Sequence, residues 1–149
     1  MTPYQPFYHP LAKSQIRLLA DSVRVLATKE PKSYKAHPTT KKFKKIWESH
    51  KVCTQDPTSP DYLCTGALPK SLSHWRRIKK GMPDRYRFFF QFSSVEQKVI
   101  YVWFNGPKNI RREGHKSDVY KTFSTLVQRG EISNVFKELL SQSCKLSDS

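Results

Sequence analysis

The chain has 149 residues, a size that suits one domain with its own core and requires neither a disulfide framework nor a structural metal. Its 27 Lys and Arg outnumber 12 Asp and Glu, and this net charge of +15 predicts a polyanionic partner, with solubility alone as the alternative explanation. No apolar run approaches the roughly 18 residues of a membrane span and no signal pattern is visible, so we expect a cytoplasmic protein without membrane contact.

The N-terminal third is predicted to be an extended arm followed by two helices. Residues 1–10 hold three prolines among aromatic side chains and are expected to pack on the body of the protein as an arm. Apolar residues recur at helical spacing over 11–30, with Pro10 and Pro31 as boundaries. A second helix is predicted over 39–52, and one of its faces consists of Lys41, Lys42, Lys44, Lys45 and Lys51. That face is either solvated or contacts an RNA backbone or an acidic partner.

The middle of the chain is predicted to form a sheet. Residues 55–72 contain several prolines and no sustained period, which indicates a connecting segment of unusual length. The period then changes to two, with a short strand around Ile78 and a turn over 81–83. A strand alternates over 85–93, and the apolar run over 99–104 is typical of a central strand buried on both faces. We expect at least three antiparallel strands.

The C-terminal third is predicted to be helical. A basic loop over 105–116 leads to Ser117, the expected N-cap of a helix that ends at Gly130. A final helix follows, and the polar tail over 141–149 is expected to fray. The element order predicts a single domain over 1–149 of the α+β class, in which helices pack on an antiparallel β-sheet.

Strand parity divides the side chains of the sheet between two faces. One set is expected to face the core: Tyr86, Phe88, Phe90 and Phe92. The alternate set faces the other way: Arg85, Arg87, Phe89 and Gln91. Trp75 and Phe89 share the parity of the basic side chains, so they are candidates for stacking on RNA bases.

Basic side chains concentrate over 70–121, where thirteen Lys and Arg stand against four Asp and Glu. Arg77 and Lys79 share one strand face, and Arg85 and Arg87 share another across the turn. If the hairpin brings these ends beside the loop after the next strand, several cationic groups converge on one site. Such a group would bind a scissile phosphodiester and stabilise the charge on its transition state.

Cleavage of RNA without a metal requires attack by the 2′-OH, a base that takes its proton and an acid that protonates the leaving 5′-oxygen. Lys79, crowded by like charges, is a candidate base, and His115 is the alternative acid or base because imidazole titrates near neutral pH. A surface position without a catalytic role is the other interpretation of His115. Tyr120 would stack on a base or hydrogen-bond to the 2′-OH. The spacing of the histidines and cysteines predicts neither a metal nor a cofactor.

Short motifs run through most of the chain. They lie at 8–10, 29–34 and 56–60, in RYRFFF from Arg85, and over 103–120, which contains WFN and PKNIR. Together they resemble YhaV-type toxins of bacterial toxin–antitoxin operons, which belong to the RelE superfamily of messenger-RNA endonucleases. By motif, the working residues of the family fall on Arg77, Lys79, Arg87, Arg111 and Tyr120, with Arg85 as a neighbour. These five and His115 are the candidate catalytic residues, and the candidate RNA-binding residues are Trp75, Arg76, Lys80, Arg85, Lys108, Arg112 and Lys116.

The resemblance implies a RelE-like fold and a metal-independent cut of mRNA that leaves a 2′,3′-cyclic phosphate and blocks translation, on or off the ribosome. It also implies a PrlF-like or AbrB-like antitoxin that inhibits the toxin and represses their operon with it at operator DNA. Two alternatives are a noncatalytic nucleic-acid-binding module and an inactive toxin relative that acts only as a corepressor. The net charge and the aromatic side chains would suffice for the first of these.

Overall fold

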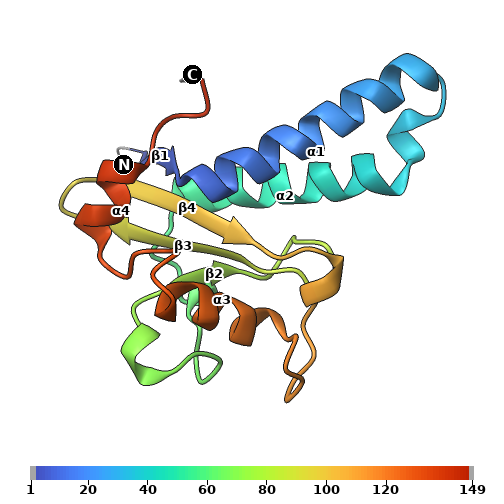
Figure 1. Ribbon diagram of the computed structural model, residues 1–149. Coiled ribbons are helices and arrows are strands. Elements are labelled where there is room, and N and C mark those ends of the chain that lie inside the picture. Colours follow the sequence, from blue (N-terminus) through green and yellow to red (C-terminus); the bar gives the residue numbers. More distant parts are fainter. Residues whose placement is uncertain (1–2, 148–149) are drawn as a thin grey trace.

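A computed structural model describes residues 3–147, and within this range a mixed four-stranded sheet has helices on both faces (Figure 1). The sheet order is β1-β4-β3-β2, with β1 at Gln5–Tyr8, β2 at Arg76–Ile78, β3 at Phe88–Ser93 and β4 at Lys98–Phe104. The helices are α1 at Pro10–Lys29, α2 at Pro38–Gln55, α3 at Val119–Gln128 and α4 at Phe136–Gln142. The predicted α+β class is confirmed.

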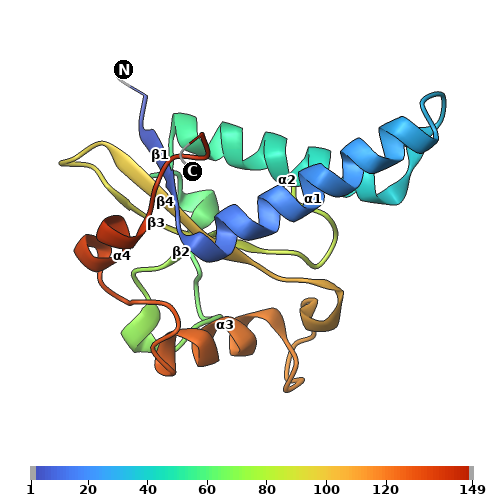
Figure 2. The same cartoon turned by 45° about the horizontal axis from the view of Figure 1, so that its top comes forward.

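Both long helices begin at a His-Pro pair. The Nδ1 atoms of His9 and His37 each accept a hydrogen bond at 3.1 Å from the amide of the residue two positions further on. Each histidine is followed by a proline, Pro10 in α1 and Pro38 in α2. Proline has no N–H to leave unpaired at the start of a helix, and its fixed φ suits the first helical turn. α1 and α2 form a hairpin that projects beyond the sheet (Figure 2). In the part of the chain described here, no helix has the length and apolar character to cross a bilayer.

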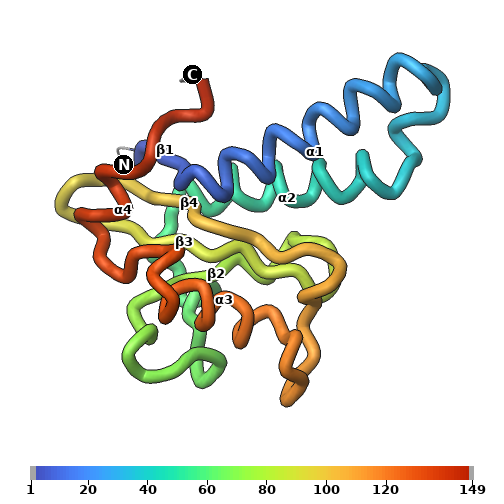
Figure 3. Tube along the Cα trace, viewed as in Figure 1, coloured from blue at the N-terminus to red at the C-terminus, as the bar shows by residue number. Residues whose placement is uncertain are grey.

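The strand β1 is the main departure from the predicted sheet. It pairs in parallel with β4, with Tyr8 opposite Tyr101, so the sheet is mixed and not antiparallel throughout. On its other side, the amide of Tyr8 donates to the carbonyl of Cys144 at 2.7 Å, and the amide of Cys144 donates back at 3.1 Å. The predicted arm is therefore a strand and the predicted frayed tail is attached to it (Figure 3). The outermost residues of both, 1–2 and 148–149, lie outside the described range.

An apolar cluster lies on each face of the sheet. Under α1 and α2 it includes Ile16, Ile46, Phe88, Phe90 and Tyr101. Under α3 and α4 it includes Trp75, Phe89, Val102, Trp103, Phe123, Ile132 and Leu139. The predicted alternation along β3 is confirmed, but α3 and α4 bury the second face as completely as the first. The C-terminal helix starts at Phe136, later than predicted, and Ile132 lies buried in the segment before it.

Candidate active site

Three arginines from separate parts of the chain meet at the side chain of Tyr120. Arg77 on β2 donates from Nε to the phenol oxygen at 2.8 Å, and Arg87, just before β3, donates from Nε to the same oxygen at 3.2 Å. Arg111, in the loop after β4, has its guanidinium carbon 4.9 Å from the centre of the phenol ring. These four residues are called the arginine cluster below. Pairing of β2 with β3 and of β3 with β4 brings them together, as expected if the hairpin placed the strand ends beside the loop after β4.

Asp118 fixes two members of this cluster at once. One oxygen of its buried carboxylate accepts from the Tyr120 amide at 3.0 Å and from Nη1 of Arg111 at 2.9 Å. The other accepts from the Arg112 amide at 2.6 Å. Asp118, and not the predicted Ser117, is the N-cap of α3. An aspartate just before an apolar-periodic segment is a sequence signal for this role.

Asn105 fixes Arg87 in a comparable way. Its side chain, buried at the end of β4, accepts from the Arg87 amide at 2.8 Å and donates to the carbonyls of Arg85 and Asn109. Arg85 itself has a φ of 65°, a left-handed conformation that L-residues rarely adopt, and its carbonyl also accepts from the Arg111 amide at 3.0 Å. The two loops that carry arginines are therefore joined through backbone bonds. A polar residue ending an apolar strand was the available sequence signal.

The arginine cluster keeps part of its hydrogen-bonding capacity for a ligand. Nη1 of Arg77 donates to the Asp61 carbonyl and Nη1 of Arg87 to the Tyr86 carbonyl, both at 3.0 Å. Within residues 3–147, Nη2 of neither arginine has a hydrogen-bond partner. The phenol oxygen of Tyr120 accepts from both arginines, so its own proton is left for donation. This arrangement leaves three donor groups, two guanidinium and one phenol, for an anion.

A groove of about 420 Å³ opens beside Arg87, and we call it the basic groove. Its lining residues include Lys79, Lys80, Arg85, Asp61 and Asp84. Lys79 follows the end of β2 and does not lie on the strand with Arg77, as the predicted shared face required. It is exposed, and two carboxylates, Asp61 and Asp84, line the same groove.

The other candidate residues lie outside the arginine cluster. His115 is exposed, and its Nδ1 lies 2.8 Å from Oγ of Ser117 in a local turn. No contact in the described part of the chain joins His115 to Tyr120. Arg76 turns its guanidinium to the backbone carbonyls of residues 73–75. Three further candidates, all exposed, lie on the loop after β4: Lys108, Arg112 and Lys116.

Trp75 and Phe89 are not available for base stacking, and that prediction is wrong. Both are fully buried because α3 covers their face of the sheet: Trp75 meets Phe123 edge-on at 4.8 Å, and Phe89 stacks on Phe123 at 4.0 Å. The ring of Tyr120 is also occupied, by the guanidinium of Arg111 and by an edge contact with Phe89 at 5.6 Å. Tyr120 therefore offers its hydroxyl and not its ring face.

The described residues include no cluster of metal ligands, and two of the three cysteines do not fit a nucleophile. Across residues 3–147, no group of three or more His, Cys, Asp or Glu side chains is arranged to hold a metal ion. Burial raises the pKa of the Cys53 thiol to about 12 and that of Cys64 to about 11. Both therefore stay protonated near neutral pH, which does not fit a cysteine nucleophile.

Comparisons with known proteins identify the family. The model of the YhaV toxin family, described as a toxin with endonuclease activity, of toxin-antitoxin system, matches residues 6–144. This range contains the whole arginine cluster. The chain belongs to the YhaV toxin family.

Curated YhaV proteins cover most of the chain. The Ribonuclease toxin YhaV of Escherichia coli K12 is 32% identical over 128 residues, which are 83% of this chain and 81% of the relative. Toxin YhaV of Escherichia coli O157:H7 and of O6:H1 match to the same extent. No solved structure matches the chain significantly. As a YhaV toxin, the chain has endonuclease activity and acts within a toxin–antitoxin system, which implies an antitoxin partner.

Proposed function

We propose that this YhaV toxin cleaves messenger RNA at the arginine cluster, without a metal ion, by attack of a ribose 2′-OH on the neighbouring phosphorus. The observation that carries the proposal is the convergence of two arginine Nε–H groups on the oxygen of Tyr120, with Arg111 against its ring. RNA as the substrate is supported by the Escherichia coli K12 relative, whose name is Ribonuclease toxin YhaV.

The guanidinium groups bind the scissile phosphate. Nη2 of Arg77 and of Arg87 face no protein acceptor, and Arg111 is oriented by its ion pair with Asp118. Attack by the 2′-oxygen places extra negative charge on the non-bridging phosphate oxygens, and charged donors fixed beforehand stabilise that charge most strongly. The positive charge that a metal would bring is supplied by these arginines, which supports a metal-independent reaction.

Proton transfer completes the reaction. A bond forms between the 2′-oxygen and phosphorus, the bond from phosphorus to the 5′-oxygen breaks, and the product is a 2′,3′-cyclic phosphate. Tyr120 is the proton donor of the cluster and protonates the leaving 5′-oxygen. The base that takes the 2′-OH proton comes from the two sequence candidates, Lys79 in the basic groove and His115 in the loop after β4. The other cations of the basic groove hold flanking phosphates.

The biological setting follows from the substrate and the family. Cleavage of mRNA would block translation. Because the substrate is in the cytoplasm, the toxin would act there. We propose that its inhibitor is a PrlF-like or AbrB-like antitoxin, whose complex with the toxin represses their operon at operator DNA. The net charge of +15 favours an acidic face on this inhibitor.

Cleavage of mRNA by the purified chain in EDTA, with and without ribosomes, tests the proposal. We expect cleavage in at least one setting, with a 2′,3′-cyclic phosphate on the upstream fragment. Arg87→Ala should abolish cleavage, whereas Arg129→Ala, which changes an exposed side chain after α3 and outside the cluster, should retain it. Binding without cleavage in both settings would refute the proposal and favour a binding module or an inactive corepressor.

A further inference from the structure

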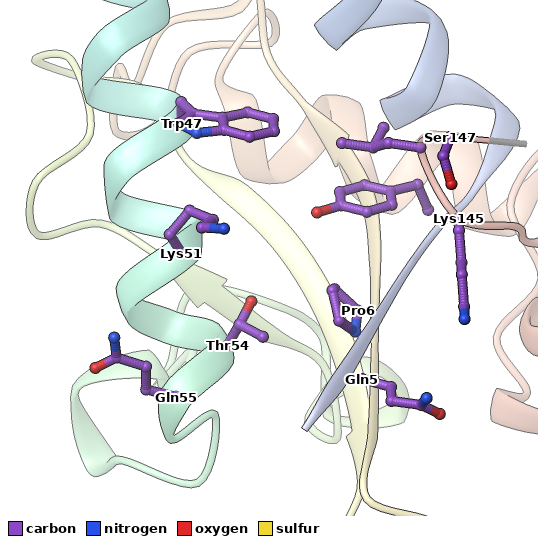
Figure 4. A pocket seen from close by; sticks show the side chains of 10 residues that line it. Gln5, Pro6, Trp47, Lys51, Thr54, Gln55, Lys145 and Ser147 are labelled. Carbon is purple, nitrogen blue, oxygen red and sulfur yellow. The ribbon is translucent and has the colours of Figure 1, made fainter. Parts of the chain in front are cut away.

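A second groove, of about 600 Å³, lies at the β1 edge of the sheet. Figure 4 shows side chains of α2 on one wall, with β1 and the C-terminal segment on the other. Its lining includes Pro6, Tyr8, Trp47, Lys51, Lys145 and Leu146. We call it the edge groove. The arginine cluster is assembled at the opposite side of the sheet, around β2.

The edge groove combines apolar walls with cations. The half-buried ring of Trp47 projects into it, and Pro6 and Leu146 also line it (Figure 4). Lys51 is exposed, with its ammonium nitrogen 5.9 Å from the centre of the indole ring. Lys145 is a second lining cation, and none of the lining residues in the described chain is Asp or Glu. The groove therefore suits a bulky apolar side chain with carboxylates next to it.

Buried hydrogen bonds hold the two walls together. The Tyr8 hydroxyl lies 2.7 Å from Nε2 of His50, and Nδ1 of His50 lies 2.7 Å from the Trp47 carbonyl. Because a carbonyl only accepts, Nδ1 carries the proton, and in the neutral ring Nε2 accepts from Tyr8. This chain of bonds links β1 to α2 beneath the groove. The groove is thus formed before a ligand arrives, which lowers the entropic cost of binding.

The chemistry of the groove favours a protein partner over RNA. Guanidinium groups, which bind phosphate bidentately, gather in the arginine cluster, and no arginine lines the edge groove in the described chain. An apolar wall with lysines at its rim matches an acidic peptide with an apolar anchor. A toxin–antitoxin system supplies such a partner, and a toxin of charge +15 selects for an acidic one.

We propose that the edge groove docks the antitoxin. An acidic segment of the antitoxin lies along it, packs one bulky apolar side chain against Trp47 and places a carboxylate at Lys51. The contact tethers the inhibitor on the side of the sheet away from the arginine cluster, and a separate part of the antitoxin blocks cleavage. The proposal rests on the toxin–antitoxin function for the existence of this partner, and it does not depend on which residues cleave RNA.

Reversal of one charge tests the proposal. Lys51→Glu should weaken binding of the purified antitoxin from the same operon at least tenfold in calorimetry, and leave RNA cleavage by the free toxin unchanged. Lys44→Glu, on an exposed lysine of α2 outside the groove, is the matched control and should change the Kd less than twofold. Equal affinities for the two variants would overturn the proposal, as would a Lys51→Glu toxin that loses RNA binding but keeps its antitoxin affinity.

Fluorine NMR of the toxin labelled with 5-fluorotryptophan gives a second, direct measurement. Trp75 and Trp103 are buried, whereas Trp47 is half-buried in the groove. The Trp47 resonance, assigned by its loss in Trp47→Phe, should shift when unlabelled antitoxin is added. A complex that forms without moving this resonance would overturn the proposal. Failure of the wild-type toxin to cleave RNA would instead count against the proposed ribonuclease activity.

Discussion

Tyr120 is restrained at both its oxygen and its ring, and the two restraints have different consequences. Its oxygen receives hydrogen bonds from Arg77 and Arg87, which aligns the hydroxyl relative to both guanidinium planes. Its ring lies between Arg111 and Phe89 and cannot move toward a base without breaking these contacts. A tyrosine held in this way is suited to proton donation at a fixed point.

Tyr120→Phe should lower the single-turnover rate of RNA cleavage by about 100-fold, because it removes the proton donor. The free energy of unfolding should fall by about 1–3 kcal/mol, since two guanidinium N–H groups lose their acceptor. The control is Tyr86→Phe, a buried tyrosine whose ring lies under the ammonium of Lys42, in the cluster below α1 and α2. Equal cleavage rates for the two variants would contradict the role of Tyr120.

Convergence of Arg77, Arg87, Arg111 and Tyr120 was predictable because strand alternation and family motifs pointed to the same residues. Stacking by Trp75 was predicted wrongly for a physical reason. Parity shows which side chains share a face, but whether that face meets solvent depends on the helices that pack on it. The apolar residues of α3 and α4 that cover Trp75 lie more than forty positions later in the chain.

A single carboxylate links the start of α3 to the loop after β4. Asp118 caps the helix through the Tyr120 amide and pairs with Arg111, so the start of α3 and the loop after β4 move together. The carboxylate is almost fully buried, and its charge is compensated by Arg111. We classify Asp118 as a positioning residue, because it contacts cluster members and not the reacting atoms.

Asp118→Asn and Asp118→Ala separate the two roles of this side chain. Asparagine is also a good N-cap, so Asp118→Asn should cost less unfolding free energy than Asp118→Ala, for which we expect about 1–3 kcal/mol. Both variants remove the charge that orients Arg111, and both should lower the rate constant of cleavage by a similar factor. Urea denaturation and single-turnover cleavage measure the two effects. If the cleavage rate constant falls only in proportion to the loss of unfolding free energy in the two variants, Asp118 has a structural role alone.

Sequence periodicity was sufficient to predict the long helices, but it was insufficient to predict the short strand β1. Both helices of the hairpin were predicted close to their observed bounds, because they repeat an apolar face over several turns. β1 has only four residues, and one of them is Pro6, so it has no readable period. Its strand conformation comes from pairing with β4 and Cys144, which lie far away in the sequence.

At the scale of the whole molecule, the fold depends on a neutral histidine in its core. His50 is fully buried among aromatic rings, with Tyr101 5.0 Å and Trp47 4.9 Å away. Burial lowers the pKa of His50 from 6.5 to about 4, although its bond to the Trp47 carbonyl partly opposes this shift. The unfolded chain therefore binds a proton at this histidine in a pH range where the folded protein does not.

Lowering the pH from 6.5 to about 4 should reduce the free energy of unfolding by about 3 kcal/mol through His50 alone. Well above pH 6.5 the contribution of His50 is constant, because the ring is then neutral in both states. Burial also lowers the pKa of His9, which acts in the same sense. Urea midpoints across this range should vary less in His50→Phe, whereas His115→Gln, at an exposed site, should keep the wild-type profile. An unchanged profile in His50→Phe would contradict this account.

The charge distribution predicts how RNA affinity depends on salt. The three guanidinium contacts to phosphates contribute about −2 to the slope of the logarithm of the association constant against that of the salt concentration, and the cations of the basic groove add to it. Arg111→Ala should make the slope shallower by about 0.7, and Arg129→Ala, on an exposed residue after α3, should not change it. Titrations with an RNA that lacks the attacking 2′-OH measure binding without cleavage. Equal slopes for both variants would place Arg111 away from the RNA.

The pairing of Tyr8 with Cys144 makes the edge groove depend on two segments that lie far apart in the sequence. During synthesis, β1 is made long before Cys144. The edge groove therefore cannot form until the segment around Cys144 has been made. A protease that removed the segment from Cys144 to Leu146 would open the edge groove while leaving the arginine cluster intact. If the groove docks the antitoxin, such a clipped toxin would keep its activity and escape its inhibitor.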